Sequence, residues 1–174
     1  MRQKQTPKEP MDAFDLHRGS DKACVRGLCK LIARDPTGRI TQVVDWGDNL
    51  IVDDGLAGIA SRLNGDGSEA VFTTFAVGTG TTAAAAGDSA LETEITDSGL
   101  ARAAATVGRE TDTATNDTAT WDKTWTVTGT KAVTECGIIN NVVSGGTLLG
   151  RRVFSAINVA NGYTLQLIYK IVFS

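Results

Sequence analysis

The residues that most often carry out catalysis are scarce in this chain. A serine or cysteine nucleophile needs a neighbouring base, usually histidine, and the only histidine is His17. It follows Pro7 and Pro10 in a segment of mixed charge without a regular apolar pattern, where nothing would hold an imidazole in place. We therefore expect His17 to be solvated and the protein not to be an enzyme.

Acidic residues gather at two places. Asp88, Glu92 and Glu94 follow a glycine-rich stretch, and Asp53 and Asp54 are adjacent. Two carboxylates could act as the acid and base of a glycosidase, or could bind calcium. Neither spacing matches an EF-hand loop, and acids among small polar residues are usually solvated. We expect solvated side chains here, with no catalytic residue and no metal site.

The stretch Gly78-Thr79-Gly80 invites comparison with phosphate-binding loops. A Walker loop needs a lysine followed by serine or threonine at the start of a helix, and the dinucleotide fingerprint needs a third spaced glycine. Both features are missing. A sharp turn after a strand explains these glycines without a ligand, so no cofactor is expected.

Tryptophans could form a platform for sugar binding. Trp121 and Trp125 lie four residues apart on one face of a predicted strand, about 13 Å along it, too far to stack on one ring. With Trp46, they are better explained as core or subunit-contact residues. Carbohydrate binding remains the less favoured alternative.

The three cysteines, Cys24, Cys29 and Cys136, form no metal signature, because zinc sites need closely spaced pairs and further ligands. Cys24 and Cys29 are five residues apart, on the order of 16 Å in an extended chain, and point to opposite faces, so we expect no bond between them. Cys136 alternates with Thr134 and Ile138 and is expected to be a buried thiol. In the cytosol all three should be reduced.

The elements that would position these residues are mostly strands. A hairpin is predicted over 27–46, from the strands Leu28–Arg34 and Ile40–Trp46 and the turn Asp35-Pro36-Thr37-Gly38 between them. Further predicted strands are Val71–Val77, Leu100–Glu110, Trp121–Val127, Ala132–Ile139, Leu148–Phe154 and the strictly alternating Tyr163–Phe173.

A single helix is predicted near residues 54–64. Leu56, Ile59, Ala60 and Leu63 follow the spacing of an apolar helix face. Asp53 or Asp54 could cap its start, and Gly65 could end it in a left-handed conformation. One helix among about eight strands predicts an all-β fold, a β-sandwich or jelly-roll-like domain over residues 25–174.

Residues 1–24 are predicted to form an extended N-terminal arm. They contain isolated apolar residues that cannot bury enough surface to fold alone. The arm either stays disordered or is ordered by lying across a neighbour. Its candidate anchor is the short apolar patch that contains Met11, Phe14 and Leu16.

Charge and hydropathy exclude several partners. The net charge is −3 and the isoelectric point is near 5.1, without the basic stripe that nucleic-acid binding requires. The sequence contains no run of about 18 apolar residues, so no membrane span is predicted. Basic residues near the N-terminus are not followed by the apolar segment of a secretory signal, so synthesis in the cytoplasm is expected.

The order of motifs resembles a known group of proteins. Asn49-Leu50-Ile51-Val52 precedes the helix, and the later motifs are Phe75-Ala76-Val77-Gly78-Thr79-Gly80, Ser89-Ala90-Leu91-Glu92-Thr93-Glu94, Val133-Thr134-Glu135-Cys136-Gly137-Ile138-Ile139-Asn140, Gly146-Thr147-Leu148-Leu149-Gly150-Arg151 and Val153-Phe154-Ser155-Ala156-Ile157. Over residues 28–174 this series resembles small structural proteins of tailed bacteriophages and the N-terminal domains of tail-collar fibre proteins. Ile138-Ile139 departs from the group's usual bulky residue at this point.

The resemblance implies an oligomeric virion β-sandwich without catalysis. The protein is expected to be a structural component of a tailed phage particle, either a capsid-decoration protein or a neck/collar protein. It is expected to form a homo-oligomer, specifically a trimer, and to pack against other virion proteins of the capsid, neck or tail. The alternative is a tail fibre or receptor/glycan-binding module. Because a particle leaves the host cytoplasm at lysis, Cys24 and Cys29 are candidates for inter-subunit disulfides between neighbouring arms and domains.

Overall fold

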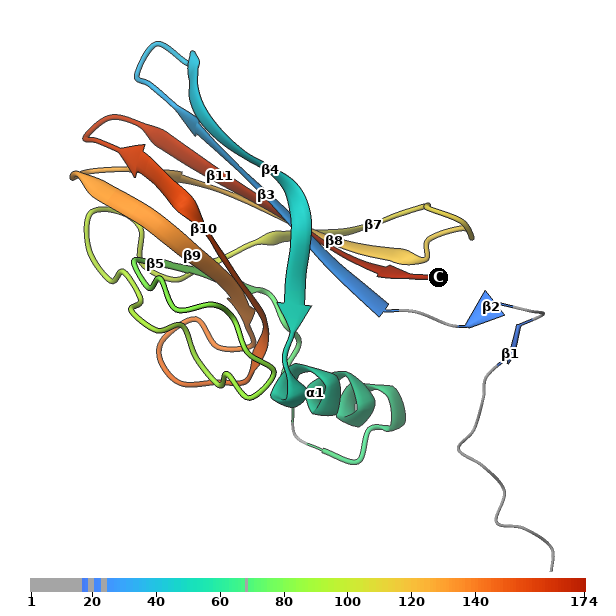
Figure 1. The fold of residues 1–174 in the computed structure, drawn as a ribbon. Coiled ribbons are helices and arrows are strands. Elements are labelled where there is room, and N and C mark those ends of the chain that lie inside the picture. Colours follow the sequence, from blue (N-terminus) through green and yellow to red (C-terminus); the bar gives the residue numbers. More distant parts are fainter. Residues whose placement is uncertain (1–16, 19–20, 23–24, 68) are drawn as a thin grey trace, which may run out of the picture.

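A computed structural model describes residues 17–18, 21–22, 25–67 and 69–174 (Figure 1). Half of the chain is in strands and 8% is helical, which confirms the predicted all-β fold with one short helix. Two short strands, β1 (His17–Arg18) and β2 (Asp21–Lys22), pair antiparallel. The candidate anchor Met11, Phe14 and Leu16 lies outside the described residues, as does Cys24.

Nine strands form one continuous antiparallel sheet in the order β6-β5-β9-β10-β4-β3-β11-β8-β7. The sheet folds over itself into the two layers of a sandwich (Figure 1). Its strands are β3 (Val25–Arg34), β4 (Ile40–Ile51), β5 (Thr74–Gly78), β6 (Ala103–Ala104), β7 (Thr106–Glu110), β8 (Thr118–Thr126), β9 (Lys131–Ile139), β10 (Leu148–Val159) and β11 (Thr164–Phe173).

The two layers are joined at the end of β4. Along most of its length β4 pairs with β3, and only Leu50 and Ile51 pair with β10. Beyond that point β4 and β10 diverge (Figure 1). On the opposite side, two indole groups bridge the layers: Trp121 Nε1 donates to the carbonyl of Phe72 (2.6 Å), and Trp125 Nε1 donates to that of Ala101 (3.0 Å).

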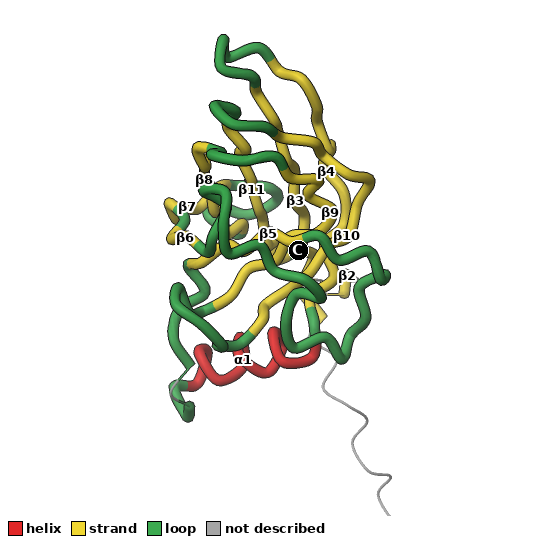
Figure 2. Tube along the Cα trace, turned by 90° about the vertical axis from the view of Figure 1, so that its left-hand side faces the viewer, coloured by secondary structure: helices red, strands yellow, loops and turns green. Residues whose placement is uncertain are grey.

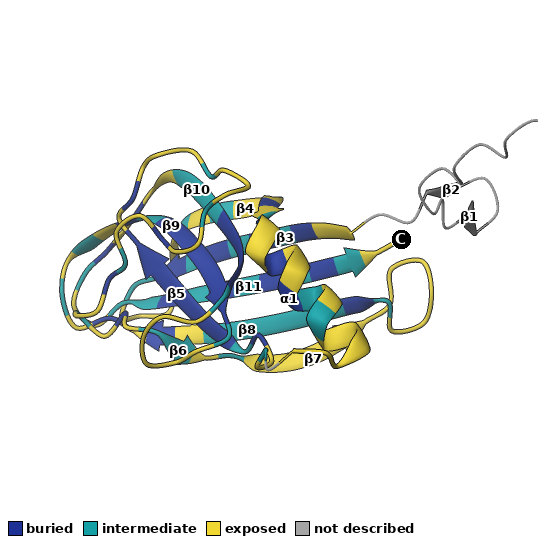
Figure 3. Ribbon diagram, turned by 90° about the horizontal axis from the view of Figure 1, so that it is seen from below, coloured by how far each residue is buried: buried dark blue, intermediate teal, exposed yellow. Residues whose placement is uncertain are grey.

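The core lies between these layers, where the inward faces of β3, β5, β9 and β11 are buried (Figure 3). The predicted alternation of β11 is confirmed, since Leu165, Leu167, Tyr169 and Ile171 are all buried. The ring of Tyr169 packs against two others, with centroids 5.8 Å from Trp121 and 6.2 Å from Phe75. This aromatic contact fills the space between the layers near α1.

The helix α1 (Asp53–Asn64) covers one end of the sandwich (Figure 2). Gly65 ends it at φ 70°, as predicted, but the predicted cap is wrong: Val52 is the N-cap residue and makes no side-chain cap. Asp53 and Asp54 instead lie in the first turn, where a negative charge interacts favourably with the helix dipole.

The face that α1 buries also differs from the predicted one. Gly55 and Gly58 are buried, and a Cβ added at Gly58 would lie 2.7 Å from the ring of Phe72. The backbone of α1 therefore approaches the sheet closely through its glycines. Leu56 is 48% exposed and Leu63 is 88% exposed, so most of the predicted apolar stripe is left uncovered.

Candidate functional site

A buried ion-pair cluster lies between β9, β10 and the loop after β5. Arg151, on β10, is 2% exposed, and its Nε donates to Glu135 on β9 at 2.8 Å. Its two terminal nitrogens face Asp88 at 2.8 Å and Glu92 at 3.4 Å. Because an unpaired buried charge is costly, the three carboxylates together allow the guanidinium to remain in the interior.

Glu135 organises the backbone around it. The carboxylate is fully buried and accepts hydrogen bonds from three backbone N–H groups, those of Gly80 (3.0 Å), Thr93 (2.8 Å) and Glu92 (3.1 Å). It therefore fixes the loop that runs over residues 79–93 onto β9.

The glycines of Gly78-Thr79-Gly80 are explained by this carboxylate. A Cβ at Gly80 would lie 2.5 Å from Glu135 Oε1, and a Cβ at Gly78 would clash with the same atom. Neither glycine has a positive φ. Close approach of Glu135 to both glycines, of the Thr93 carbonyl to Gly78 and of the Glu92 side chain to Gly80 leaves no room for a Cβ, whereas the sequence had suggested a sharp turn.

Asp88 (23% exposed) and Glu94 (20% exposed) are enclosed ion-pair partners and not the solvated side chains that the sequence predicted, whereas Glu92 is 39% exposed. The N–H of Ala85 lowers the pKa of Asp88 below its usual value, with a further contribution from Arg151. The pKa of Glu92 is lowered by hydrogen bonds from Thr82. A general acid at neutral pH needs a raised pKa, so these lowered values fit structural ion pairs.

Glu94 has a separate partner. Both of its oxygens accept from Arg102, at 2.6 and 2.8 Å, in a bidentate pair that is largely buried. Another Arg102 nitrogen donates to the carbonyls of Asn141 (3.2 Å) and Gly145 (2.6 Å). The pair therefore ties the loop between β5 and β6 to the loop between β9 and β10.

Within the described ranges, no group of three or more His, Cys, Asp or Glu side chains is arranged to hold a metal ion. In the same part of the chain, no helix has the length and apolar character needed to cross a membrane.

Cys29 and Cys136 meet in the core. Cys29 lies on β3 and Cys136 on β9, each is fully buried, and their Sγ atoms are 3.7 Å apart. The prediction of a buried Cys136 thiol is confirmed. The inter-subunit disulfide predicted for Cys29 would require this enclosed sulfur to become accessible to a neighbouring chain, and it stays a prediction. Cys24, the other candidate for such a bond, lies outside the described residues.

The surroundings of the two thiols differ. The hydrogen bond with Cys136 is the main cause that lowers the pKa of Cys29 to about 7, and Arg152 adds to this effect against the opposing effect of burial. Arg152 Nη1 lies 3.6 Å from Cys29 Sγ and donates to the carbonyl of Cys29 at 2.6 Å. The pKa of Cys136 is raised by its hydrogen bond with Cys29 and by burial.

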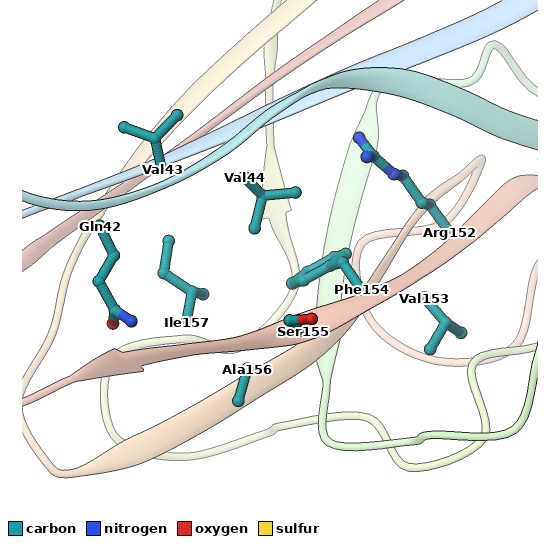
Figure 4. Close-up of a pocket in the computed structure, with 9 residues that line it drawn as sticks. All are labelled: Gln42, Val43, Val44, Arg152, Val153, Phe154, Ser155, Ala156 and Ile157. Atoms are coloured by element: carbon teal, nitrogen blue, oxygen red, sulfur yellow. The ribbon is translucent and has the colours of Figure 1, made fainter.

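A cleft of about 450 Å³ lies where β4 and β10 diverge (Figure 4). Val44, Phe154 and Ile157 point into the space between the two strands (Figure 4). Gln42 closes its far end by accepting a hydrogen bond from the backbone N–H of Asn158 (2.5 Å). Its one ionisable lining residue is Arg152, which is already bound to backbone carbonyls, so the cleft offers no obvious reactive group.

A second hollow, here named the α1 groove, has a volume of about 770 Å³ and lies between α1 and the strands β7, β8 and β11. Its walls are mostly apolar and include strongly exposed side chains: Leu63 (88%), Val107 (57%) and Val71 (52%). Its lining residues are Ile59, Arg62, Leu63, Val71, Phe72, Thr73, Val107, Gly108, Ala119, Thr120, Trp121, Leu149, Ile171 and Phe173.

The tryptophans occupy different environments. Trp125 is buried, which confirms its predicted place in the core, and Trp121 is half-buried and lines the α1 groove. Trp46 is 41% exposed and lies under the ammonium of Lys170, 5.1 Å from the ring centroid. The sequence reasoning did not foresee the α1 groove, although the uncovered Leu63 could have suggested it.

The sandwich begins beside this groove. Val25, the first residue of β3, pairs with Phe173 at the end of β11, and Phe173 lines the α1 groove. The 24 residues that precede Val25 are therefore joined to the domain at the edge of the α1 groove.

No family model matches this sequence, and no match is found among curated proteins or solved structures.

Proposed function

We propose that this chain is a structural subunit of a tailed phage particle, a capsid-decoration or neck/collar protein. It forms a homotrimer and packs against other virion proteins, without a catalytic step. The motif order of residues 28–174 supports the particle, and the α1 groove supports assembly through apolar contacts. The groove is the observation that carries this proposal.

The α1 groove leaves too much apolar surface in water for a protein that works alone. Leu63, Val107, Val71 and Phe173 are between 44% and 88% exposed and line one hollow. Burying a fully exposed side chain of this size contributes roughly 1.5–3 kcal/mol, and covering a half-exposed one contributes about half as much. Large contiguous apolar patches usually mark sites of protein contact, so the groove is a docking surface.

The occupant of the α1 groove is the Met11–Leu16 segment of a neighbouring copy. The arm joins its domain at Val25, next to the groove, and carries the apolar residues Met11, Phe14 and Leu16. Asp12 and Asp15 alternate with them and complement Arg62 in the groove. Insertion into a neighbour, repeated around a symmetry axis, closes a ring of identical contacts.

Sedimentation velocity of the full-length chain tests this arrangement. The wild type is expected to sediment as a trimer, and Leu63→Asp or Phe14→Asp should shift it to monomer. Leu63 is on the surface of α1, so its substitution should leave the fold intact. Val143→Asp is the matched control, because Val143 is 82% exposed outside the α1 groove, and it should remain trimeric.

A wild type that stays monomeric over a wide concentration range would contradict the proposal. If Leu63→Asp dissociates the trimer but Phe14→Asp does not, the α1 groove has another occupant, and the proposed docking of the arm in it is wrong.

A further inference from the structure

Cys29 and Cys136 hold positions that link the two layers of the sandwich. They are 107 residues apart in sequence, and their strands, β3 and β9, belong to opposite halves of the folded sheet. Among the described strands, backbone pairing between these halves passes through two residue pairs, Leu50 with Arg151 and Ile51 with Gly150. A covalent bond between the cysteines would therefore join layers that are otherwise held mainly by core packing.

We propose that Cys29 and Cys136 form an intramolecular disulfide that locks the two layers together once the protein leaves a reducing compartment. The sulfurs are already 3.7 Å apart and face each other within the core. A disulfide requires about 2.0 Å, so side-chain rotation must close a gap of about 1.7 Å. No backbone element lies between them, since the two sulfurs are in direct contact.

The oxidant is a small disulfide such as oxidised glutathione. The thiolate of Cys29 attacks one sulfur of glutathione disulfide, whose S–S bond breaks and releases one glutathione thiolate. Cys136 then loses its proton and attacks the Cys29 sulfur of the mixed disulfide, which releases the second glutathione thiolate. Two cysteine thiols are oxidised and one glutathione disulfide is reduced to two glutathione molecules.

The local chemistry favours Cys29 as the first nucleophile. The hydrogen bond with Cys136 lowers the pKa of Cys29, whereas the pKa of Cys136 is raised, so Cys29 is the thiol that loses its proton more readily where the two sulfurs are in contact. Arg152 touches Cys29 Sγ and also lines the cleft between β4 and β10 (Figure 4). Because both sulfurs are enclosed in the closed fold, oxidation should be fastest during folding or transient opening.

Counting free thiols in the full-length chain tests the proposal. The protein is refolded in a glutathione redox buffer, denatured in excess N-ethylmaleimide and measured by intact mass. Of the three cysteines, only Cys24 should be alkylated, and a proteolytic digest should contain the peptide pair that joins Cys29 to Cys136. Prior treatment with dithiothreitol should restore alkylation of all three.

A disulfide between Cys29 and Cys136 closes a loop whose ends are 107 residues apart, which strongly constrains the unfolded chain. The oxidised form should therefore melt on the order of 10 °C above the reduced form. Cys24→Ser is the matched control and should keep both the disulfide and this shift, while Cys136→Ser should lose both.

Alkylation of all three cysteines after equilibration in the oxidising buffer would overturn the proposal. So would a linked peptide that joins Cys24 or Cys29 to a second copy of the chain. These outcomes are read on the wild type, so they stand even if a variant folds poorly. They are also independent of whether the chain belongs to a phage particle.

Discussion

Glu135 Oε2 and Arg151 Nε lie 2.8 Å apart on neighbouring strands of the sandwich, and both side chains are enclosed. This pair connects the sheet to the loop that covers it, because the same carboxylate binds the N–H groups of Gly80, Glu92 and Thr93. Removing one partner leaves a buried charge without compensation, which is more damaging than the loss of a surface ion pair.

Glu135→Ala should therefore lower the free energy of unfolding by about 3–5 kcal/mol, measured by urea denaturation. The matched control is Asp48→Ala, which breaks the exposed pair with Arg26 (60% and 75% exposed) and should cost at most about 1 kcal/mol. Equal losses in the two variants would show that the Glu135 cluster is not a structural centre.

Gly80 leaves space for the Glu135 carboxylate. Gly80→Ala would place a methyl group 2.5 Å from Oε1 and should destabilise the fold by about 1–3 kcal/mol. Gly87→Ala, in the same loop, places its methyl in open space and should have little effect. Thermal melts of both variants measure the difference, and a Gly80→Ala variant as stable as Gly87→Ala would refute the explanation of these glycines.

Acid should weaken the cluster around Arg151. The pKa of Asp88 and that of Glu92 are both lowered in the folded state, so their contribution is complete above their ordinary values of 3.8 and 4.5. It is lost as the pH falls below those values and through the folded-state pKa. The melting temperature should accordingly decrease once the pH is lowered below about 4.5.

Asp88→Asn removes one of these titrating groups. The variant should be less stable at pH 7, and its melting temperature should fall less between pH 5 and pH 2.5 than that of the wild type. Parallel curves for the two proteins would mean that other carboxylates cause the acid sensitivity.

The arm should contribute to assembly and not to the stability of the isolated sandwich. Deletion of residues 1–23 is expected to leave the melting temperature nearly unchanged at concentrations where the wild type is monomeric, because the arm lacks a periodic apolar face. The same deletion should abolish trimer formation at higher concentration. A large fall in the melting temperature of the monomer would place the arm in the core.

Local patterns were sufficient to predict much of the fold. The alternation of Tyr163–Phe173 placed one face of β11 in the core, and Gly65 marked the end of α1, since both signals depend on residues close in sequence. The predicted strand Leu100–Glu110 is instead divided into β6 and β7 around Ala105, whose N–H donates to the carbonyl of Thr73.

Long-range contacts were beyond the reach of these patterns. Leu63 belongs to a regular apolar stripe, yet α1 packs through Gly55 and Gly58 because the sheet approaches its backbone there. Glu135 gave one usable signal, a lone acid within the apolar run Val133–Ile139. Its partner Arg151 could not be identified from sequence spacing, because the pairing depends on the register of β9 with β10.

Cryo-electron microscopy of particles purified from a lysate of the cells that encode this chain tests the central claim most directly. The account predicts many copies of the 25–174 sandwich on the capsid or at the neck, with each α1 groove covered by the arm of a neighbouring copy. Particles that lack the domain would contradict the account, as would a few copies confined to fibre tips, which would favour a receptor- or glycan-binding module instead.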